Sequence, residues 1–274
     1  MDVVAYQGEA GAYSEAGVIA LFPEADHRAL PSIRAVFESV EVGRASWGLV
    51  PMDNSQAGSI NETYDLFLRH GLHLVAETIV RVDHCLLALP GTSLDDIREV
   101  ISHPQAIAQS EEFLSALEAT VRAEYNTAGA AKQIAEQRLE HTAAIASRRA
   151  AELYGLEVLA ESIQTYPDNH TRFGALSRNP SPLGTPNKSS LVFGVGHVAG
   201  SLYRCLGALA ERHLNLTKLE SRPRPGRRWE YVFYADVESA ADLPTMIEAL
   251  AELSQHATFT RLLGTYEGAV ARTP

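Results

Sequence analysis

The sequence predicts an α/β protein in two parts, a larger α/β part followed by a smaller one of the ferredoxin-like βαββαβ type. Over most of the 274 residues, short β-rich runs alternate with helical patterns, which is typical of sheets covered by helices. A polar segment with three prolines and a glycine, residues 179–188, then interrupts this alternation. The length of the chain also favours two domains over one.

The larger part begins with "VVAYQG" (3–8), whose apolar β-rich run predicts a strand, and a helix follows at 14–22. Two further helices, 32–43 and 59–71, each end at a glycine, the residue that most readily closes a helix. The other predicted strands are 46–52, a long strand-like stretch at 73–89, 99–102, 121–125, 142–147, 158–163 and 171–178. The other predicted helices are 104–119, 127–140 and 148–155.

The smaller part has a different order of elements. It reads as strand 189–195, helix 200–213, strands 214–223 and 229–238, helix 241–255 and strand 260–267. This βαββαβ order is that of a ferredoxin-like unit, and the segment is long enough to fold by itself.

Composition excludes several classes of function. The formal net charge of −11 argues against a nucleic-acid partner, because phosphate binding needs a basic face. The longest apolar runs, such as 85–90, are too short to cross a bilayer, and the N-terminal sequence carries no secretory signal. Cys85 and Cys205 lie far apart and form no CxxC pair. We therefore expect a cytoplasmic protein with two buried, reduced thiols and no membrane partner.

Four loops lie where α/β folds usually bind ligands, between the end of a strand and the next helix. In "SHPQ", Pro104 suits the first helical position, which leaves His103 as the N-cap. The helix dipole then favours a neutral imidazole that acts as a hydrogen-bond partner. Taken alone, each loop also fits a simple turn or a helix cap. The four loops are residues 7–14, 51–59, 102–105 and 126–131.

A fifth stretch, "PDNHTRFGALSR" (167–178), sets a hydroxyl, a guanidinium and an aromatic ring side by side where the chain leaves a loop. The tripeptide "DHC" (83–85) has no further metal ligands at helical spacing, and no HExxH, GxSxG, P-loop or dinucleotide motif occurs. The sequence therefore predicts no metal and no cofactor. Hydroxyls, amides, one histidine and one arginine suit the binding of a small polyanion, or a reaction that needs positioning and one proton.

Taken together, in their order along the chain, these loops resemble prephenate dehydratase, the enzyme that makes phenylpyruvate in phenylalanine biosynthesis. The similar motifs are "GEAGAYSE", "VPMDNSQAGSINETYDL", "SHPQA", "NTAGAA", "AAIAS…AELYGL" and "NHTRF", and "LNLTKLESRP" resembles the phenylalanine-binding ACT domain attached to these enzymes. The resemblance implies a two-subdomain catalytic domain, similar to periplasmic binding proteins, with the active site in the cleft. The implied boundaries are 1–180 for the catalytic domain (subdomain one 1–78 with 168–180, subdomain two 80–165), 181–188 for a linker and 189–270 for the ACT domain.

The resemblance implies that Thr171 assists the departure of the substrate's ring hydroxyl, with His103 or water as a relay. Arg172 either anchors a carboxylate or, because side chains alternate along a strand, makes a structural ion pair away from Thr171. Phe173 would share the face of Thr171 and exclude water. The residues expected to bind prephenate are Ser14, Asp53, Asn54, Ser55, Ser102, Gln105, Thr127, Asn169, Arg172 and Phe173.

The ACT resemblance implies feedback inhibition by L-phenylalanine and a homodimer, or a homotetramer, formed through this domain. The expected effector residues are His197, Ala199, Gly200, Ser201, Leu202, Glu220, Ser221, Arg222 and Pro223. Two positions depart from the family. Asp53 stands where a glutamate is usual, and "GHVAGSL" (196–202) replaces Asn-x-Pro-Gly-Ala-Leu. The second departure leaves open an ACT domain that only dimerises the protein.

Two other functions remain open from the sequence. An arogenate dehydratase would carry out the same chemistry on a substrate with an amino group on its side chain. A non-catalytic solute-binding or amino-acid-sensing protein would use the same cleft, although the intact Thr-Arg-Phe motif favours an enzyme.

Overall fold

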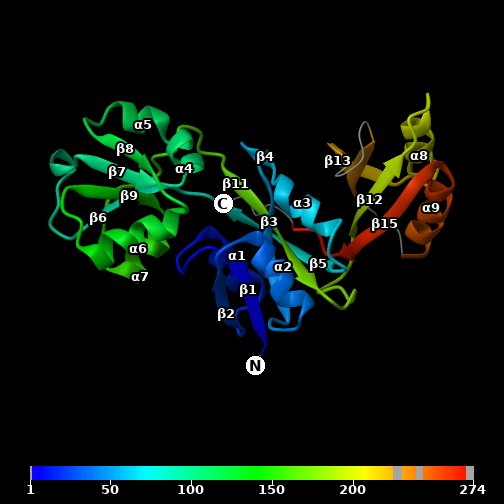
Figure 1. Ribbon diagram of the computed structural model, residues 1–274, viewed down its shortest axis with the longest axis horizontal. Helices are drawn as coiled ribbons and strands as arrows, with labels where there is room; N and C mark the ends of the chain where they lie inside the picture. The colour runs from blue at the N-terminus through cyan, green and yellow to red at the C-terminus, as the bar shows by residue number, and fades with distance from the viewer. Residues whose placement is uncertain (1, 225–229, 239–242, 270–274) are drawn as a thin grey trace. The chain divides into compact units, whose positions relative to one another are not determined.

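The computed structural model describes residues 2–224, 230–238 and 243–269 (Figure 1). The predicted α/β class is confirmed, with two helix-covered sheets in the larger part and a βαββαβ unit at the C-terminal end. Cys85 and Cys205 are free and buried, as expected. No helix among the described residues is long and apolar enough to span a membrane.

The first sheet has six strands in the order β2-β1-β3-β11-β5, with β4 paired to β3. β1 (Val3–Gln7) pairs in parallel with both β2 (Asp26–Leu30) and β3 (Trp47–Asn54). This arrangement brings the loop after β1 and the loop after β3 to the same edge of the sheet. The remaining elements are α1 (Tyr13–Leu21), α2 (Ile33–Glu41), β4 (Gly58–Ser59), α3 (Asn61–Phe67), β5 (His73–Arg81) and β11 (His170–Ser177).

The second sheet has five strands in the order β10-β6-β9-β7-β8, and both of its faces are covered. Cys85 and Leu87 of β6 (Cys85–Ala88) pack on the side of α6 and α7, whereas Leu86 and Ala88 pack on the side of α4 and α5. A strand buried on both faces reads as a continuous apolar run, as "CLLA" does. The remaining elements are η1 (Leu94–Asp96), β7 (Glu99–Ser102), α4 (Pro104–Gln109), α5 (Glu111–Ser115), β8 (Thr120–Ala123), α6 (Thr127–Gln137), β9 (Thr142–Ala146), α7 (Arg148–Tyr154) and β10 (Glu157–Ala160).

The chain passes between these two sheets twice, and the two passages are hydrogen-bonded to each other. Val82 N donates to Asn169 O at 2.8 Å, and Ile163 N donates to His84 O at 2.9 Å. The His84 backbone N–H also donates to the Gln164 side chain at 2.8 Å. The two passages therefore lie side by side, next to the start of β11.

The C-terminal unit is a four-stranded antiparallel sheet in the order β13-β14-β12-β15, with two helices. Its apolar core includes Leu191 and Phe193 from β12, Cys205 from α8 and Leu253 from α9. The elements are β12 (Lys188–Val195), α8 (Ser201–Ala210), β13 (Asn215–Pro223), β14 (Tyr231–Glu238), α9 (Leu243–His256) and β15 (Ala257–Tyr266).

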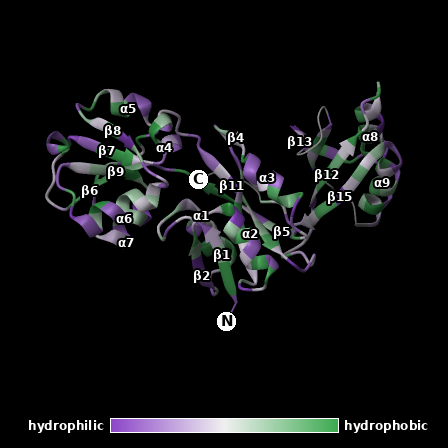
Figure 2. Ribbon diagram, in the orientation of Figure 1, coloured by the Kyte–Doolittle hydropathy of each residue, from purple (hydrophilic) through white to green (hydrophobic). Residues whose placement is uncertain are grey.

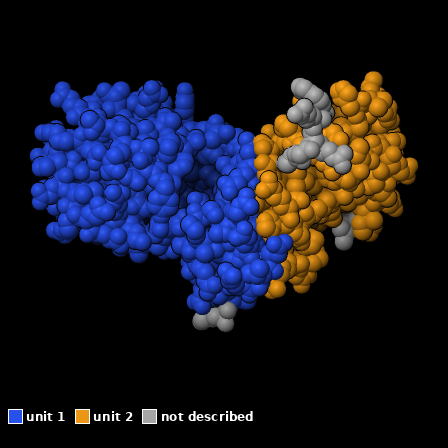
Figure 3. Space-filling model, viewed as in Figure 1, with its two compact units in different colours: residues 1–63, 78–173 blue, residues 64–77, 174–274 orange. Residues whose placement is uncertain are grey.

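By contacts between residues, the chain divides into two compact units (Figure 3). The first contains residues 1–63 and 78–173, and the second contains 64–77 and 174–274. The second unit therefore includes most of α3 and β5 together with the βαββαβ unit. Within it, Arg261 of β15 donates to the carbonyl oxygens of Phe67, His70 and Leu72. These bonds hold the end of α3 and the segment that follows it against β15.

Strand β2 was missed by the sequence analysis. Its residues, "DHRAL", are mostly exposed and lack the alternation of apolar and polar side chains that predicts a strand. β1 is largely hydrophobic, whereas β2 is hydrophilic over most of its length (Figure 2). As an edge strand, β2 is held by backbone bonds to β1 rather than by burial of its side chains.

Replacing Gly264 by alanine should destabilise the second unit. A Cβ at this position would lie 1.8 Å from the Leu74 carbonyl oxygen, and the backbone there has no room to move aside. We expect a loss of about 1–3 kcal/mol or more in the free energy of unfolding, measured as a lower melting temperature. The matched control is Gly207→Ala in α8, where a Cβ meets nothing within 4 Å. That change should raise stability by about 0.5–1 kcal/mol, and equal melting temperatures for the two variants would contradict the packing described.

Candidate active site

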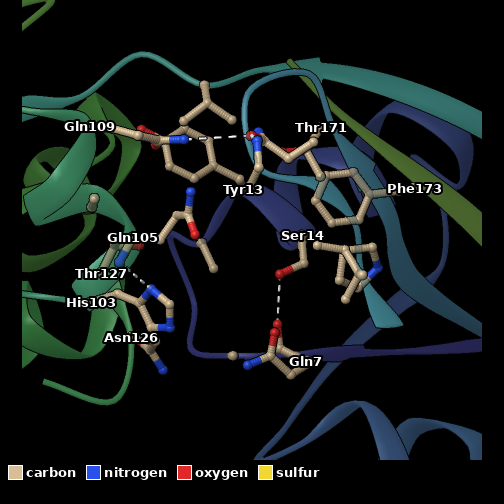
Figure 4. Close-up of a pocket in the computed structure, with 18 of the residues that line it drawn as sticks. Gln7, Tyr13, Ser14, His103, Gln105, Gln109, Asn126, Thr127, Thr171 and Phe173 are labelled. Atoms are coloured by element: carbon tan, nitrogen blue, oxygen red, sulfur yellow. Dashed lines mark hydrogen bonds between the residues drawn. The ribbon is translucent and has the colours of Figure 1, made fainter. Parts of the chain in front are cut away.

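A cavity of about 250 Å³ lies in the first unit, at the edge of the first sheet where the two passages of the chain run. Thr171 and Phe173 border it from the start of β11, and His103, Gln105 and Thr127 face them from the helices of the second sheet (Figure 4). Among the described residues that line the cavity, none is Asp, Glu, Lys or Arg. An anionic ligand would therefore be held by hydroxyls, amides, imidazoles and backbone N–H groups.

The structure brings many of the expected site residues together around this cavity. Those that line it are Ser14, Asn54, His103, Gln105, Thr127, Thr171 and Phe173. Asn169 is fully buried and lies behind Asn54, to which it is hydrogen-bonded. The loops after β1, β3 and β7, the start of α6 and the start of β11 therefore meet at one place.

Besides Asn169, four expected substrate-binding residues do not line the cavity. Asp53 and Arg172 pair with each other, and Arg172 Nε donates to Asp53 Oδ2 at 2.8 Å. The two residues point away from the cavity because side chains alternate along β3 and β11. Ser55 is exposed, and its hydroxyl accepts from His170 N and donates to Asp168 O. Ser102 is fully buried, and its hydroxyl donates to Ile145 O at 2.6 Å.

The Thr171 hydroxyl is held by the side chain of Asn54. The Asn54 Oδ1 atom accepts from the backbone N–H groups of Gln56 (3.1 Å) and Ala57 (2.9 Å), which fixes the orientation of the carboxamide. Asn54 Nδ2 therefore faces β11 and donates to Thr171 Oγ1 at 3.1 Å. Because Thr171 Oγ1 accepts this bond, its own proton is available to a ligand in the cavity.

His103 is the N-cap of α4, as the sequence predicts. Its Nδ1 accepts from the Gln105 backbone N–H at 3.1 Å, so the proton of the neutral ring is on Nε2. Burial lowers the pKa of His103, which keeps the ring neutral near pH 7. The side chain is thus a neutral donor at the wall of the cavity.

The loop after β1 is tied to the helices of the second sheet. Glu9 accepts from Tyr125 Oη at 2.6 Å and from Lys132 Nζ at 3.0 Å. Burial, together with the bond to Glu9, raises the pKa of Tyr125 to about 12, so its hydroxyl stays protonated. Gly11 has a φ of +86°, and a Cβ there would come within 2.9 Å of Ala150 Cα, so this close approach requires glycine. Ser14 donates its hydroxyl proton to Gln7 O at 2.6 Å, which leaves its backbone N–H, in the first turn of α1, as the group it offers to an anion.

Three residues that complete the site were missed by the sequence analysis. Tyr13, His84 and Gln109 all line the cavity and are joined by hydrogen bonds. Gln109 lies inside the predicted helix 104–119, where the sequence gives no sign that it faces a ligand. Tyr13 lies in the candidate ligand loop 7–14 but was not singled out there. His84 was considered only as a metal ligand, and no group of three or more His, Cys, Asp or Glu is placed to bind a metal in the described part of the chain.

Comparison with known proteins decides the family. The family model described as prephenate dehydratase matches residues 4–181, and the ACT domain model matches residues 189–255. The chain belongs to the prephenate dehydratase family. It is accordingly a hydro-lyase of aromatic amino-acid biosynthesis, with a C-terminal ACT domain.

Similar proteins agree with this assignment. Arogenate dehydratase/prephenate dehydratase 2 of Arabidopsis thaliana, a chloroplastic protein, is 43% identical over 274 residues, which cover 96% of this chain and 72% of that protein. The structure of a prephenate dehydratase from Arthrobacter aurescens in complex with L-Phe matches with a TM-score of 0.88 and 29% identity, over 99% of this chain and 92% of the other. GqqA, described as a novel type of quorum quenching acylase, also matches with a TM-score of 0.88, at 35% identity, over 99% of this chain and 100% of its own.

Replacing Asn54 by aspartate should lower turnover sharply. An aspartate can still accept from Gln56 and Ala57, but its second oxygen can no longer donate to Thr171 Oγ1, or to the neighbouring acceptors Asn169 Oδ1 and His170 O. A thermal melt of the variant separates loss of fold from loss of rate. We expect kcat to fall by about 10²–10³, the usual loss when one oriented donor is removed from a site. Steady-state phenylpyruvate formation measures the effect.

The matched control is Asn179→Asp, which adds the same charge outside the cavity. Asn179 Oδ1 accepts from Ser181 N and Ser181 Oγ, and a carboxylate oxygen can accept both bonds. This variant should keep its turnover. Equal activity of the two variants would show that the Asn54 amide does not direct Thr171.

Proposed function

We propose that this protein converts prephenate to phenylpyruvate, with Thr171 as the group that assists loss of the ring hydroxyl, and that L-phenylalanine inhibits it through the ACT domain. The observation that supports the assignment of Thr171 is the bond from Asn54 Nδ2 to Thr171 Oγ1, in a cavity whose described lining residues include no Asp, Glu, Lys or Arg. This bond polarises the hydroxyl and directs its proton towards a bound substrate.

The reaction proceeds by loss of a carboxylate and a hydroxyl from opposite ends of the substrate ring. The bond between the ring and its carboxylate carbon breaks, and its electron pair enters the ring as carbon dioxide leaves. The C–O bond at the other end breaks, and the departing oxygen takes up one proton to leave as water. Thr171 donates a hydrogen bond or the proton itself, and water from the solvent returns a proton to its oxygen, while His103 Nε2–H serves as a hydrogen-bond donor in the site. Phe173, 4% exposed, excludes water beside Thr171.

Backbone and side-chain donors at the cavity hold the substrate's side-chain carboxylate. The first-turn N–H groups of α1, at Tyr13 and Ser14, and Thr127 at the start of α6 are available for this. We propose that prephenate is preferred over arogenate, because the described lining residues include no carboxylate to neutralise an ammonium group. Assay of both substrates with the same protein tests this preference.

The similarity to GqqA suggests hydrolysis of an amide as a second activity. A threonine nucleophile needs a neighbouring base that accepts its proton. Asn54 instead donates to Thr171 Oγ1, which is the arrangement of an acid and not of a nucleophile. We therefore place dehydration first and include an N-acyl homoserine lactone as a comparison substrate in the assay.

Replacing Thr171 by alanine should lower kcat on prephenate by about 10²–10⁴, the usual contribution of a positioned proton donor. Binding should persist, because the carboxylate contacts are unchanged, and calorimetric titration with prephenate measures it. Thr171→Ser keeps the hydroxyl and should retain much of the activity. Near-normal turnover in Thr171→Ala would remove Thr171 from the mechanism.

We propose that the effector binds beside the loop 196–202 and the strand β13, as the ACT resemblance implies. The related Arthrobacter aurescens structure was described in complex with L-Phe. Along β13, Ser221 and Pro223 are exposed and alternate with Glu220 and Arg222, which are half-buried. Ser221 and Pro223, with His197, Ala199, Gly200, Ser201 and Leu202, are our proposed ligand contacts.

Arg222 has a different neighbour, the helix α3. Its Nε and Nη2 atoms donate to the two carboxylate oxygens of Asp65 at 3.3 and 3.1 Å. Next to it, Lys218 Nζ donates to Tyr64 Oη at 2.7 Å. We propose that β13 signals effector binding to α3 through these two contacts, and that inhibition requires unequal affinity of L-phenylalanine for two positions of the helix.

Replacing Asp65 by asparagine should weaken inhibition by L-phenylalanine without changing turnover in its absence. The change removes the charge that pairs with Arg222 but keeps the shape of the side chain. We expect the concentration for half-inhibition to rise about fivefold or more, the low end of common allosteric couplings.

Glu252→Gln is the matched control, because Glu252 of α9 pairs with Arg212 in the same unit and the change likewise removes one charge of an ion pair. Its inhibition should equal that of the wild type. An Asp65→Asn variant inhibited as strongly as the control would exclude this route.

We also propose a cytoplasmic homodimer or homotetramer assembled through the ACT domain, with the catalytic domain at 1–180, a linker at 181–188 and the ACT domain at 189–270. The separate matches of the two family models support this division. Sedimentation analysis of the purified chain, with and without L-phenylalanine, tests the assembly.

A further inference from the structure

A buried chain of hydrogen bonds leads from Thr171 to His84, a residue with no role in the reaction proposed above. From Asn54, which bonds Thr171, the chain runs through Asn169 to Gln109 (2.8 and 3.0 Å) and ends at His84 (3.0 Å). Asn54, Asn169, Gln109 and His84 are all at least nine-tenths buried. Gln109 Nε2 also donates to Asn54 Oδ1 at 3.5 Å.

The direction of every bond in this chain is fixed by the backbone at one end. Asn54 Oδ1 accepts two backbone N–H groups, so Asn54 Nδ2 must be the donor to Asn169 Oδ1. Asn169 then presents its Nδ2 to Gln109, and Gln109 Oε1 must accept. His84 Nε2 lies 3.0 Å from that same oxygen, so it must carry a proton and donate.

The opposite side of the ring allows this assignment. His84 Nδ1 lies 3.1 Å from Tyr13 Oη, whose single proton is also within reach of Asp83 O at 2.6 Å. His84 is 2% exposed, and burial lowers its pKa, although the bond to Gln109 and the charge of Asp83 oppose the shift. With the ring proton on Nε2, His84 Nδ1 accepts a bond only when Tyr13 turns its proton from Asp83 O towards the ring or shares it between the two.

His84 and Gln109 are also held rigidly by the second passage of the chain. The His84 N–H donates to Gln164 Oε1, and His84 O accepts from Ile163 N. Gln109 O accepts from Thr165 N at 2.8 Å. These bonds fix the backbones of His84 and Gln109, so the orientation of each side chain depends on the hydrogen bonds that it makes itself.

We propose that His84 is a positioning residue of the dehydratase: its Nε2–H donates to Gln109 and fixes the amide chain through Asn169 and Asn54 that aims the Thr171 hydroxyl into the cavity. This inference rests on the proposed role of Thr171. Without the His84 donor, Gln109 Oε1 loses one of its two bonds, and the Gln109 amide can turn. Asn169 would then lose its acceptor and could turn, and Asn54 Nδ2 would lose its bond to Asn169 Oδ1 while keeping His170 O, at 3.1 Å, as a second acceptor that competes with Thr171 Oγ1.

The first test compares His84→Gln with His84→Asn. The longer glutamine amide can place an N–H group near the position of Nε2, whereas the asparagine amide reaches only the position of Nδ1. His84→Asn should lower kcat about 10²-fold with little change in KM, because misplacement of a reacting group by about 1 Å has an effect of that size. His84→Gln should recover most of the loss, and equal impairment of the two variants would overturn the proposal.

The second test asks whether His84 acts through Thr171. In a Thr171→Ala background, His84→Asn should cause little further loss of turnover, because the hydroxyl that it positions is already absent. If His84 has a purely structural role, His84→Asn will lower the activity of the wild type and that of Thr171→Ala by the same factor. That result would also overturn the proposal. Thermal melts of each variant separate loss of fold from loss of rate.

A third measurement needs neither a variant nor activity. In ¹⁵N-labelled wild-type protein near pH 7, the His84 ring should show a protonated Nε2 and an unprotonated Nδ1. A ring protonated on Nδ1 alone would contradict the bond directions, even if the protein proves to be an active dehydratase. Conversely, the expected tautomer with no turnover of prephenate would retain the hydrogen-bond chain and reject the proposed function.

Discussion

The hydrogen bonds between the two passages of the chain, residues 82–84 and 163–169, are the constraint on which the rest of the first unit depends. They place Asn169 against Val82 and His84 against Ile163 and Gln164. Since β11 begins directly after the second passage, the same bonds determine where Thr171 lies. Backbone hydrogen bonds thus fix the position of Thr171, on the first sheet, relative to α4 of the second sheet. The side chains of the site then add hydrogen bonds between positions that the backbone has already set.

The absence of charged side chains among the described lining residues suits this chemistry better than a strong anion site would. A fixed cation next to the ring carboxylate would stabilise the bound substrate more than a transition state in which that charge is being lost. Neutral donors hold the substrate less tightly but do not oppose the departure of carbon dioxide. The protein as a whole carries a formal charge of −11, so its overall field does not attract a dianion either. Binding must therefore come from short, oriented hydrogen bonds inside the cavity.

Much of this architecture was predictable from the sequence, because local patterns determine it. Apolar runs predicted most strands, and helical patterns, some of them ending at a glycine, predicted most helices. The proline after His103 predicted the N-cap of α4. β2 was not predictable from periodicity, since its side chains are mostly exposed and only pairing with β1 makes it a strand. The alternation of β11 correctly suggested that Arg172 could face away from Thr171, but its partner Asp53 was assigned to the substrate. Tyr13, His84 and Gln109 were missed because their roles come from contacts between segments 25 to 71 residues apart.

Asp53 stands where the family usually has a glutamate, and its contacts join three strands next to the site. Asp53 accepts from Arg172 through one oxygen and from Ser59 through the other, at 2.8 and 3.1 Å. The shorter arm therefore still reaches Arg172, and it ties β11 to β4 on the side opposite the cavity. Asn54 and Thr171 are the neighbouring residues on the same two strands, so the ion pair and the bond between Asn54 and Thr171 join β3 to β11 from consecutive positions. The substitution at position 53 therefore leaves the connection between β3, β4 and β11 intact beside Thr171.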